Sequence, residues 1–176
     1  MSTLMIPQPA TEESAPFYHG YIAEVRGGNI AEQMTAQLEE LEHLFSPVND
    51  RTVPGPYAPG KWSVKEVLGH LADTERIFAY RLLRIARGDA TPLAFFDENA
   101  YVPAGRFDQR PLESLLAELR AVRQSTLALV QGLPADCWMA VGQASGKPIS
   151  ARALAYIILG HAAHHLRVLR ERYGMA

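Results

Sequence analysis

Four stretches of this sequence carry apolar residues at intervals of three and four, the spacing that gathers them on one face of an α-helix. No stretch alternates apolar and polar residues as a half-buried β-strand does, and no long segment recurs along the chain. Each helix must bury its apolar face, and four such helices do so most simply against one another. We therefore predict an all-α fold, a four-helix bundle.

Cap residues set the limits of the first two predicted helices. Asn29, followed three residues later by Glu32, is typical of a helix start, and Pro47 ends that helix. The second helix, over 63–88, opens with a Ser-x-x-Glu capping box and closes at a glycine. We expect its flanking charged residues, Glu75 among them, to pair at the surface, with Arg81 as the one that turns inward.

The third helix is predicted over 111–132, from Pro111, which suits a first helical position, to the stop made by Gly132 and Pro134. The fourth is predicted over 150–174, with Ser150 as its N-cap. Residues 29–174 then form the bundle domain, and residues 1–28 form an N-terminal extension in which 17–28 can add a turn of helix. The long connections do not force neighbouring helices to be antiparallel, so the pattern leaves the topology open.

Charge and cysteine content exclude several classes of protein. A net charge of −2 argues against a nucleic-acid binder, and a single cysteine, Cys137, excludes an intramolecular disulfide and a cysteine-based zinc finger. No apolar run reaches the roughly 20 residues of a membrane span. Residues 1–16 lack the basic start of a secretory signal. We expect a cytoplasmic protein that binds neither nucleic acid nor membranes.

Two histidines, His161 and His165, fall in the middle of the apolar stripe of the last predicted helix. They are one turn apart, so both imidazoles can reach the same point. A buried ring nitrogen without a hydrogen bond costs about 1–3 kcal/mol, so a polar partner must meet them there. A divalent metal is the simplest partner for two neutral imidazoles. The alternative is a pair of ordinary core histidines.

A metal at this point needs at least one further ligand. His70 is the candidate because it lies at the edge of the apolar stripe of the second predicted helix. Asp73 follows it, and can be a fourth ligand or the acceptor that fixes the tautomer of His70. His164 flanks the pair on the last helix, where it either supports the site or is exposed. We predict a metal centre made of His70, His161 and His165.

The connection over 89–110 is long and rich in aromatic and acidic residues, so it either carries function or is mobile. Within it, Asp97 and Glu98 are candidate contacts to a bound cosubstrate, and the alternative is an acidic helix cap or a surface loop. The HExxH, GxSxG, P-loop and GxGxxG patterns are all absent. The commonest metalloprotease, serine hydrolase, NTPase and dinucleotide-binding motifs are thereby excluded.

Three segments together resemble the DinB-like superfamily, which includes YfiT-like proteins described as metal-dependent hydrolases. They are YAPGKWSVKEVLGHLADTERIFAYRLLRIARGD over 57–89, FDENAYV over 96–102 and LAYIILGHAAHHLRVLRERY over 154–173. In that superfamily a four-helix bundle holds a divalent metal through one histidine of an HLAD-type segment and two of an HxxxH segment. The resemblance implies that these ligands are His70, His161 and His165 here, and that the metal is zinc or nickel.

The resemblance also implies a reaction class. Relatives include S-transferases that use bacillithiol or mycothiol, so we expect a metal-dependent transferase that joins such a thiol to a small electrophile, with Asp73 orienting His70. The alternative enzyme is a hydrolase of a small amide or ester, with Asp73 or His164 as general base. A third hypothesis is a non-catalytic stress-response module with a structural metal. Because relatives often dimerise, we also expect a homodimer.

Overall fold

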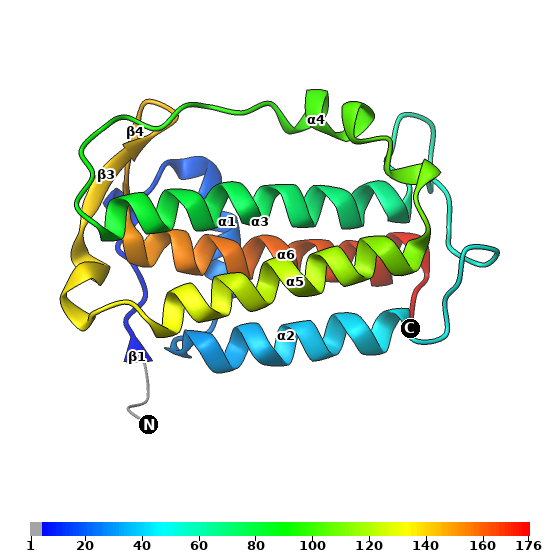
Figure 1. Cartoon of the computed structure of the whole chain (residues 1–176), viewed down its shortest axis with the longest axis horizontal. Coiled ribbons are helices and arrows are strands. Elements are labelled where there is room, and N and C mark those ends of the chain that lie inside the picture. Colours follow the sequence, from blue (N-terminus) through cyan, green and yellow to red (C-terminus); the bar gives the residue numbers. More distant parts are fainter. Residues whose placement is uncertain (1–4) are drawn as a thin grey trace.

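A computed structural model describes residues 5–176, so residues 1–4 of the predicted extension lie outside the described part. The predicted all-α, four-helix bundle is confirmed (Figure 1). No helix in the described residues is long and apolar enough to cross a bilayer. The four long helices are α2 (Ile30–Phe45), α3 (Val64–Ala86), α5 (Leu112–Gln131) and α6 (Ala151–Tyr173).

The bundle has a topology that the sequence left open. Both α2 and α3 pack against α5 and α6, so that α2 and α3 lie diagonally opposite each other. In Figure 1, α2 and α6 run in one direction and α3 and α5 in the other. Because α3 and α5 are parallel neighbours, the chain between them must return along the length of α3. This return explains why the connection after α3 is so long.

Three of the predicted helix starts are confirmed by capping hydrogen bonds. The side chain of Asn29 accepts from the backbone at the start of α2, and that of Ser150 does so at the start of α6. Ser63 forms the predicted capping box with Glu66 at the start of α3. Beyond the end of α6, Gly174 adopts a left-handed φ of 68°, a conformation that favours glycine.

The prediction that the chain has no strand was wrong. Strands β3 (Val141–Ala144) and β4 (Lys147–Ser150) form an antiparallel hairpin before α6. The two residues between them, Ser145 and Gly146, both have positive φ, at 53° and 74°, as the tight two-residue turn of a hairpin requires. These strands are short and lack alternating apolar residues, so the turn, rather than a hydrophobic pattern, defines them.

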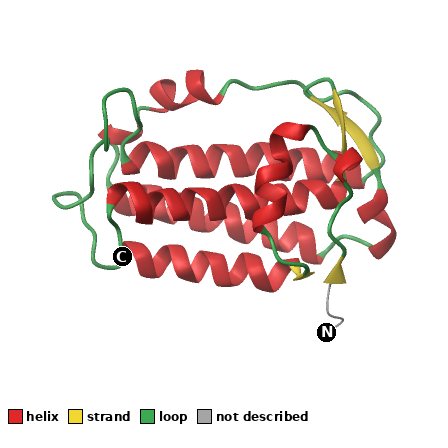
Figure 2. Ribbon diagram, turned by 180° about the vertical axis from the view of Figure 1, so that it is seen from behind, coloured by secondary structure: helices red, strands yellow, loops and turns green. Residues whose placement is uncertain are grey.

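Short elements cover two sides of the bundle. Helix α1 (His19–Glu24) packs across α6, as Figure 2 shows from behind. The strand before it, β1 (Met5–Ile6), pairs with the strand after it, β2 (Gly28–Asn29), in a small antiparallel sheet. Helix α4 (Glu98–Gly105) lies in the returning segment above α3 (Figure 1). The segment over 89–110 is therefore partly helical, where the sequence pattern indicated only a connection.

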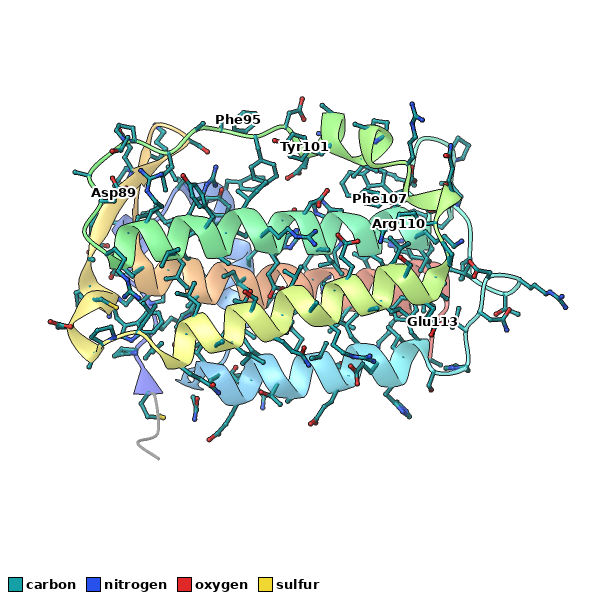
Figure 3. The ribbon with its side chains drawn as sticks, in the orientation of Figure 1. Asp89, Phe95, Tyr101, Phe107, Arg110 and Glu113 are labelled. Carbon is teal, nitrogen blue, oxygen red and sulfur yellow. The ribbon has the colours of Figure 1, made fainter. Side chains whose placement is uncertain are left out.

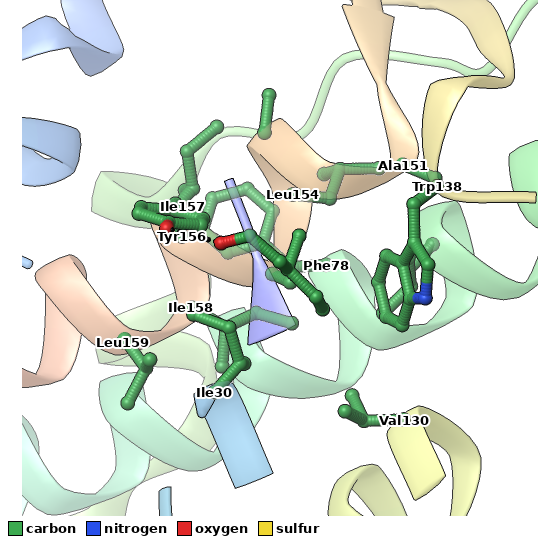
Figure 4. Packing of buried hydrophobic residues seen from close by; sticks show 14 of the residues in the cluster. Ile30, Phe78, Val130, Trp138, Ala151, Leu154, Tyr156, Ile157, Ile158 and Leu159 are labelled. Carbon is green, nitrogen blue, oxygen red and sulfur yellow. Dashed lines mark hydrogen bonds between the residues drawn. The ribbon is translucent and has the colours of Figure 1, made fainter. Parts of the chain in front are cut away.

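The buried apolar residues form two clusters. One lies near the β3–β4 hairpin and contains Ile30, Phe78 and Leu154 (Figure 4). The other lies toward the opposite end and contains Leu68, Leu115 and Leu166. Between them, each long helix contributes buried polar side chains, which we call the polar layer. Its members are Gln37, His70, Thr74, Glu75, Arg123, Thr126, His161 and His165.

The prediction that Glu75 pairs at the surface was wrong, because its side chain lies in the polar layer and is 5% exposed. It faces Arg123 of α5, which is 1% exposed. The helical pattern of α3 shows which face Glu75 occupies, but the neighbour that makes this face an interior one is α5. Helix α5 lies beside α3 only because the two helices are parallel neighbours in this topology, which the sequence did not predict.

Candidate metal centre

Three histidines from two helices meet inside the polar layer. His70 comes from α3, and His161 and His165 come from successive turns of α6. The Nε2 atoms of His70 and His161 are 2.9 Å apart, and one ring nitrogen from each of the three residues lies within 4.8 Å of the others. Their exposures are 3%, 6% and 9%, so this histidine cluster is screened from bulk water.

Burial keeps the histidine cluster neutral. It lowers the pKa of His70 to about 4, with a smaller contribution from nearby His164. It lowers the pKa values of His161 and His165 well below 6.5, and the neighbouring histidines lower them further. Neutral imidazoles are the form that binds metal ions. Above pH 6.5, therefore, the cluster can accept a cation without first losing protons.

The residues of the histidine cluster fit a divalent cation. His165 Nδ1 is buried and has no hydrogen-bond partner among the described residues. His70 Nδ1 lies 3.3 Å from the hydroxyl of Thr74, one turn along α3, and the ring of Trp62 covers the same imidazole at a centroid distance of 4.8 Å. A metal ligand of the histidine type commonly has its second nitrogen held in this way.

A glycine precedes a cluster histidine on each helix, and each glycine lets another segment approach closely. A Cβ at Gly69 would lie 2.2 Å from the ring of Phe107, so that ring packs directly on α3 beside His70. A Cβ at Gly160 would lie 1.9 Å from the carbonyl oxygen of Tyr21. Gly160 thus allows α1 to cross α6 next to His161.

The two residues predicted to assist the histidines lie outside the cluster. Asp73 is half-buried and bonds to Arg76 at 3.4 Å, and Arg76 also pairs with Glu118 of α5. Burial raises the pKa of Asp73 and Arg76 opposes this. Thr74 rather than Asp73 contacts His70 in the described structure. His164 lies beside His165, at a ring distance of 5.1 Å, and its Nδ1 is 3.3 Å from Arg167.

A pocket of about 400 Å³ opens onto the histidine cluster, and His161 and Thr74 form part of its lining. We call it the aromatic pocket, because six of its lining residues are Phe or Tyr. These ring-bearing residues are Phe17, Tyr18, Tyr21, Phe78, Phe95 and Phe96. Asp97, Glu98 and Lys147 also line it. The histidine cluster is therefore accessible to a small molecule through one wall.

The two acidic residues predicted to contact a cosubstrate both line the aromatic pocket. Asp97 is the N-cap of α4, and its side chain accepts a hydrogen bond from Asn99 N at 3.0 Å. Glu98 is half-buried, and burial together with the neighbouring Asp97 raises its pKa. The helix cap given as the alternative for these residues thus exists at Asp97, whereas Glu98 makes no such bond among the described residues. Their contact with a cosubstrate stays a prediction.

Arg81 holds the roof of the aromatic pocket. Its side chain is 2% exposed, and its guanidinium donates to the carbonyl of Ala94 at 2.7 Å and to the hydroxyl of Ser145 at 3.2 Å. The guanidinium also lies over the rings of Phe78 and Phe96, at 5.8 and 5.5 Å. Arg81 therefore joins the returning segment to the β3–β4 hairpin. Figure 3 shows Phe95 and Tyr101 on this returning segment, above α3.

Sequence reasoning missed the contributions of Thr74 and of α1. Thr74 follows His70 by four residues, one helical turn, so its position was recognisable as a partner for that imidazole. Tyr21 had no comparable signal, because its contact with His161 depends on how α1 crosses α6. The Gly-His pairs at 69–70 and 160–161 are the only local sign that another segment approaches there.

A family model and two curated proteins match most of this chain. The family model described as the DinB superfamily matches residues 33–169. A Bacillus licheniformis protein named "Putative metal-dependent hydrolase" is 28% identical over 155 residues, covering 81% of this chain and 86% of its own. A Bacillus pumilus protein of the same description is 22% identical over 150 residues, covering 80% and 85%.

A solved structure extends the comparison to the fold. YfiT from Bacillus subtilis, described as "a probable metal-dependent hydrolase with an unusual four-helix bundle topology", superposes with a TM-score of 0.73 at 18% identity. The match covers 97% of this chain and 95% of YfiT. At this identity the likeness shows a shared fold, and the covered part includes most of the chain before residue 33.

Proposed function

The chain belongs to the DinB superfamily, and from this premise we propose that it is a metal-dependent enzyme whose divalent cation is held by His70, His161 and His165. The observation that carries the proposal is the convergence of three buried imidazoles, one of which, His161, lines an open pocket. The two Bacillus relatives described as metal-dependent hydrolases support it. Imidazole ligands suit zinc and nickel, and three protein ligands leave a position for a reactant.

A bound divalent cation would lower the pKa of a water or thiol at the open position and so supply a nucleophile near neutral pH. The residues around the cluster would hold the reactant and accept a proton from it. The aromatic side chains of the pocket shield a bound reactant from water on their side, and His161 links the pocket to the cluster. Glu98 is the half-buried carboxylate in the same pocket, and its raised pKa suits a group that takes up a proton from the reactant.

Hydrolysis of a small amide or ester is the reaction that these groups support best. It requires a general base, and Glu98 is the carboxylate that lines the pocket with its pKa raised by burial. The base predicted from the sequence was Asp73 or His164. Asp73 faces Arg76 and Glu118, whereas His164 lies beside His165 and Tyr21, so His164 remains a candidate.

Thiol S-transfer is the second candidate, as the resemblance to bacillithiol-dependent enzymes implies. A pocket with mainly apolar walls can hold an apolar electrophile next to a thiol at the cluster. In this reaction Asp97 and Glu98 would contact the thiol cosubstrate. The predicted homodimer and cytoplasmic location stay predictions.

Elemental analysis tests the metal centre directly. Untagged protein purified without chelators should carry about one zinc or nickel ion per chain, and the variant His70→Ala/His161→Ala/His165→Ala should carry none. His43→Ala is the matched control, because His43 is exposed on α2. Circular dichroism should show that all three proteins keep their helices. Metal retained by the triple variant, or a wild type that takes up no added metal, contradicts the proposal.

Turnover assays then separate the two reactions. Esters and amides are tested with and without a panel of bacterial thiols, and the products are identified by mass spectrometry. Hydrolysis proceeds without thiol and is lost in Glu98→Gln, whereas transfer requires the thiol, yields a thioester and releases the alcohol or amine. A metal-loaded protein that catalyses neither reaction favours the non-catalytic module.

A further inference from the structure

The aromatic pocket is built from three segments that are distant in the sequence. Helix α3 supplies Phe78, and the returning segment supplies Phe95 and Phe96. The chain before α2 supplies the opposite wall, with Phe17, Tyr18 and Tyr21. Half of the six rings therefore come from residues that precede the part matched by the family model, which begins at residue 33.

Close packing fixes the N-terminal wall against the histidine cluster. The carbonyl of Tyr21 occupies the space that a Cβ at Gly160 would fill. In consequence the ring of Tyr21 stands edge-on to both His161 and His164, at 5.4 and 5.5 Å. Tyr18 packs edge-on against Phe78 at 5.9 Å, which joins this wall to α3. The wall is thus part of the site.

The roof of the pocket, like the N-terminal wall, is held by close packing, here at the ring of Phe96. Phe96 packs edge-on against Phe78 at 6.4 Å and lies against the guanidinium of Arg81. Arg81 is itself buried and bonded to Ala94 and Ser145. Phe95, next to it, is 72% exposed at the mouth. Exposed apolar side chains gathered around a groove are typical of a ligand-binding site.

We propose that the aromatic pocket binds a planar aromatic group of the substrate, and that the wall from Phe17 to Tyr21 determines this specificity. Aromatic walls favour edge-to-face and offset-stacked partners beyond their apolar area. A volume of about 400 Å³ suits one or two fused rings. That the bound group belongs to a substrate rests on the proposed function. Binding of the aromatic group to the pocket does not depend on catalysis.

Two neutral probes with the same carbon skeleton test the planar preference. Naphthalenemethanol is flat, and its fully saturated counterpart decalinmethanol is puckered and more apolar. Calorimetry on the protein as purified should give binding of the flat probe that is at least about tenfold tighter. A pocket that recognised only apolar area would bind the saturated probe as tightly or more so, and that result overturns the proposal.

Paired variants test the N-terminal wall. Phe17→Leu/Tyr21→Leu keeps apolar side chains but removes two rings, and should weaken naphthalenemethanol binding about tenfold. Tyr80→Leu is the matched control, because Tyr80 is 51% exposed on α3 and is not part of the pocket lining. Equal affinity of the double variant and the wild type overturns the role of this wall.

A second readout covers the case in which the double variant folds poorly. In the wild type, the NMR signals of His161 and of Phe96 should shift when naphthalenemethanol is added. Without the probe, the same signals should have unchanged positions in Tyr80→Leu. Repeating the titration after removal of metal separates the two proposals. Binding that persists without metal supports the pocket even if the metal centre fails, and absence of any shift at these residues overturns the pocket assignment.

Discussion

Arg123 and Glu75 form an ion pair in the interior of the bundle, with Arg123 Nε and Nη2 each 2.8 Å from a carboxylate oxygen of Glu75. The pair joins α5 to α3, and both side chains are almost fully buried. Arg123 also donates to the side chain of Gln37 at 2.9 Å, and Gln37 donates to the carbonyl of Leu159 on α6. This chain of bonds links all four long helices two residues before His161.

Removal of one partner from this pair should be strongly destabilising. Glu75→Ala leaves a buried guanidinium without its carboxylate, and we expect a loss of about 3–5 kcal/mol of unfolding free energy. Urea unfolding followed by circular dichroism measures it. The double variant Glu75→Leu/Arg123→Met removes both charges and should recover most of the loss. A single variant within about 0.5 kcal/mol of the wild type would contradict the assignment of a buried pair.

The residue that orients His70 can be identified by comparing two neighbours. Thr74→Val removes the hydroxyl that lies 3.3 Å from His70 Nδ1 and keeps the shape of the side chain. We expect metal affinity to fall by about 10- to 100-fold, because supporting partners of a ligand commonly contribute that much. Asp73→Asn should leave affinity unchanged. Competition with a chromophoric chelator measures both, and a larger effect at Asp73 would restore the expectation drawn from the sequence.

The close approach at Gly69 predicts opposite effects for two Gly→Ala changes. At Gly69 a Cβ meets the ring of Phe107 at 2.2 Å, so Gly69→Ala should cost about 1–3 kcal/mol through overpacking. At Gly20, in α1, nothing lies within 4 Å of the added atom. Gly20→Ala should therefore stabilise by roughly 0.5–1 kcal/mol. Thermal unfolding of both variants checks the pair, and a neutral Gly69→Ala would mean that Phe107 moves away freely.

The histidine cluster was predictable because helical periodicity alone places its members on buried stripes. His161 and His165 recur one turn apart among apolar residues, and His70 lies on a stripe edge that faces the interior. Each of these statements concerns one helix. The spacing of residues along a helix is set by its geometry, so placing each histidine on its stripe required no knowledge of neighbouring helices. That the two stripes face each other does not follow from periodicity, and the resemblance to the DinB-like superfamily implied it.

The other parts of the site depend on contacts between segments, which periodicity does not encode. Glu75 lies in the interior because α5 packs beside α3. The parallel arrangement of these two helices could not be derived from the lengths of the connections. Tyr21 contacts His161 because α1 crosses α6 at Gly160. The β3–β4 hairpin was missed since its defining feature is a two-residue turn rather than an apolar pattern.

The metal-free protein should lose stability as the pH falls below 6.5. In the folded chain, burial lowers the pKa of His70 to about 4 and those of His161 and His165 well below 6.5. The unfolded chain binds protons at these residues near pH 6.5, so between pH 6.5 and about 4 it holds more protons than the folded chain. Protonation then favours unfolding, and above this window the effect is absent.

The slope in this window identifies the residues responsible. Each histidine contributes up to about 1.4 kcal/mol per pH unit, which urea midpoints at several pH values measure after metal removal. His165→Leu should reduce the slope, because one titrating group is removed from an apolar stripe. Glu13, whose pKa Arg152 lowers to about 2, loses its contribution between pH 4.5 and about 2, so it does not affect the slope between pH 6.5 and pH 5. Equal midpoints at pH 7 and pH 5 would show that the cluster is hydrated rather than buried.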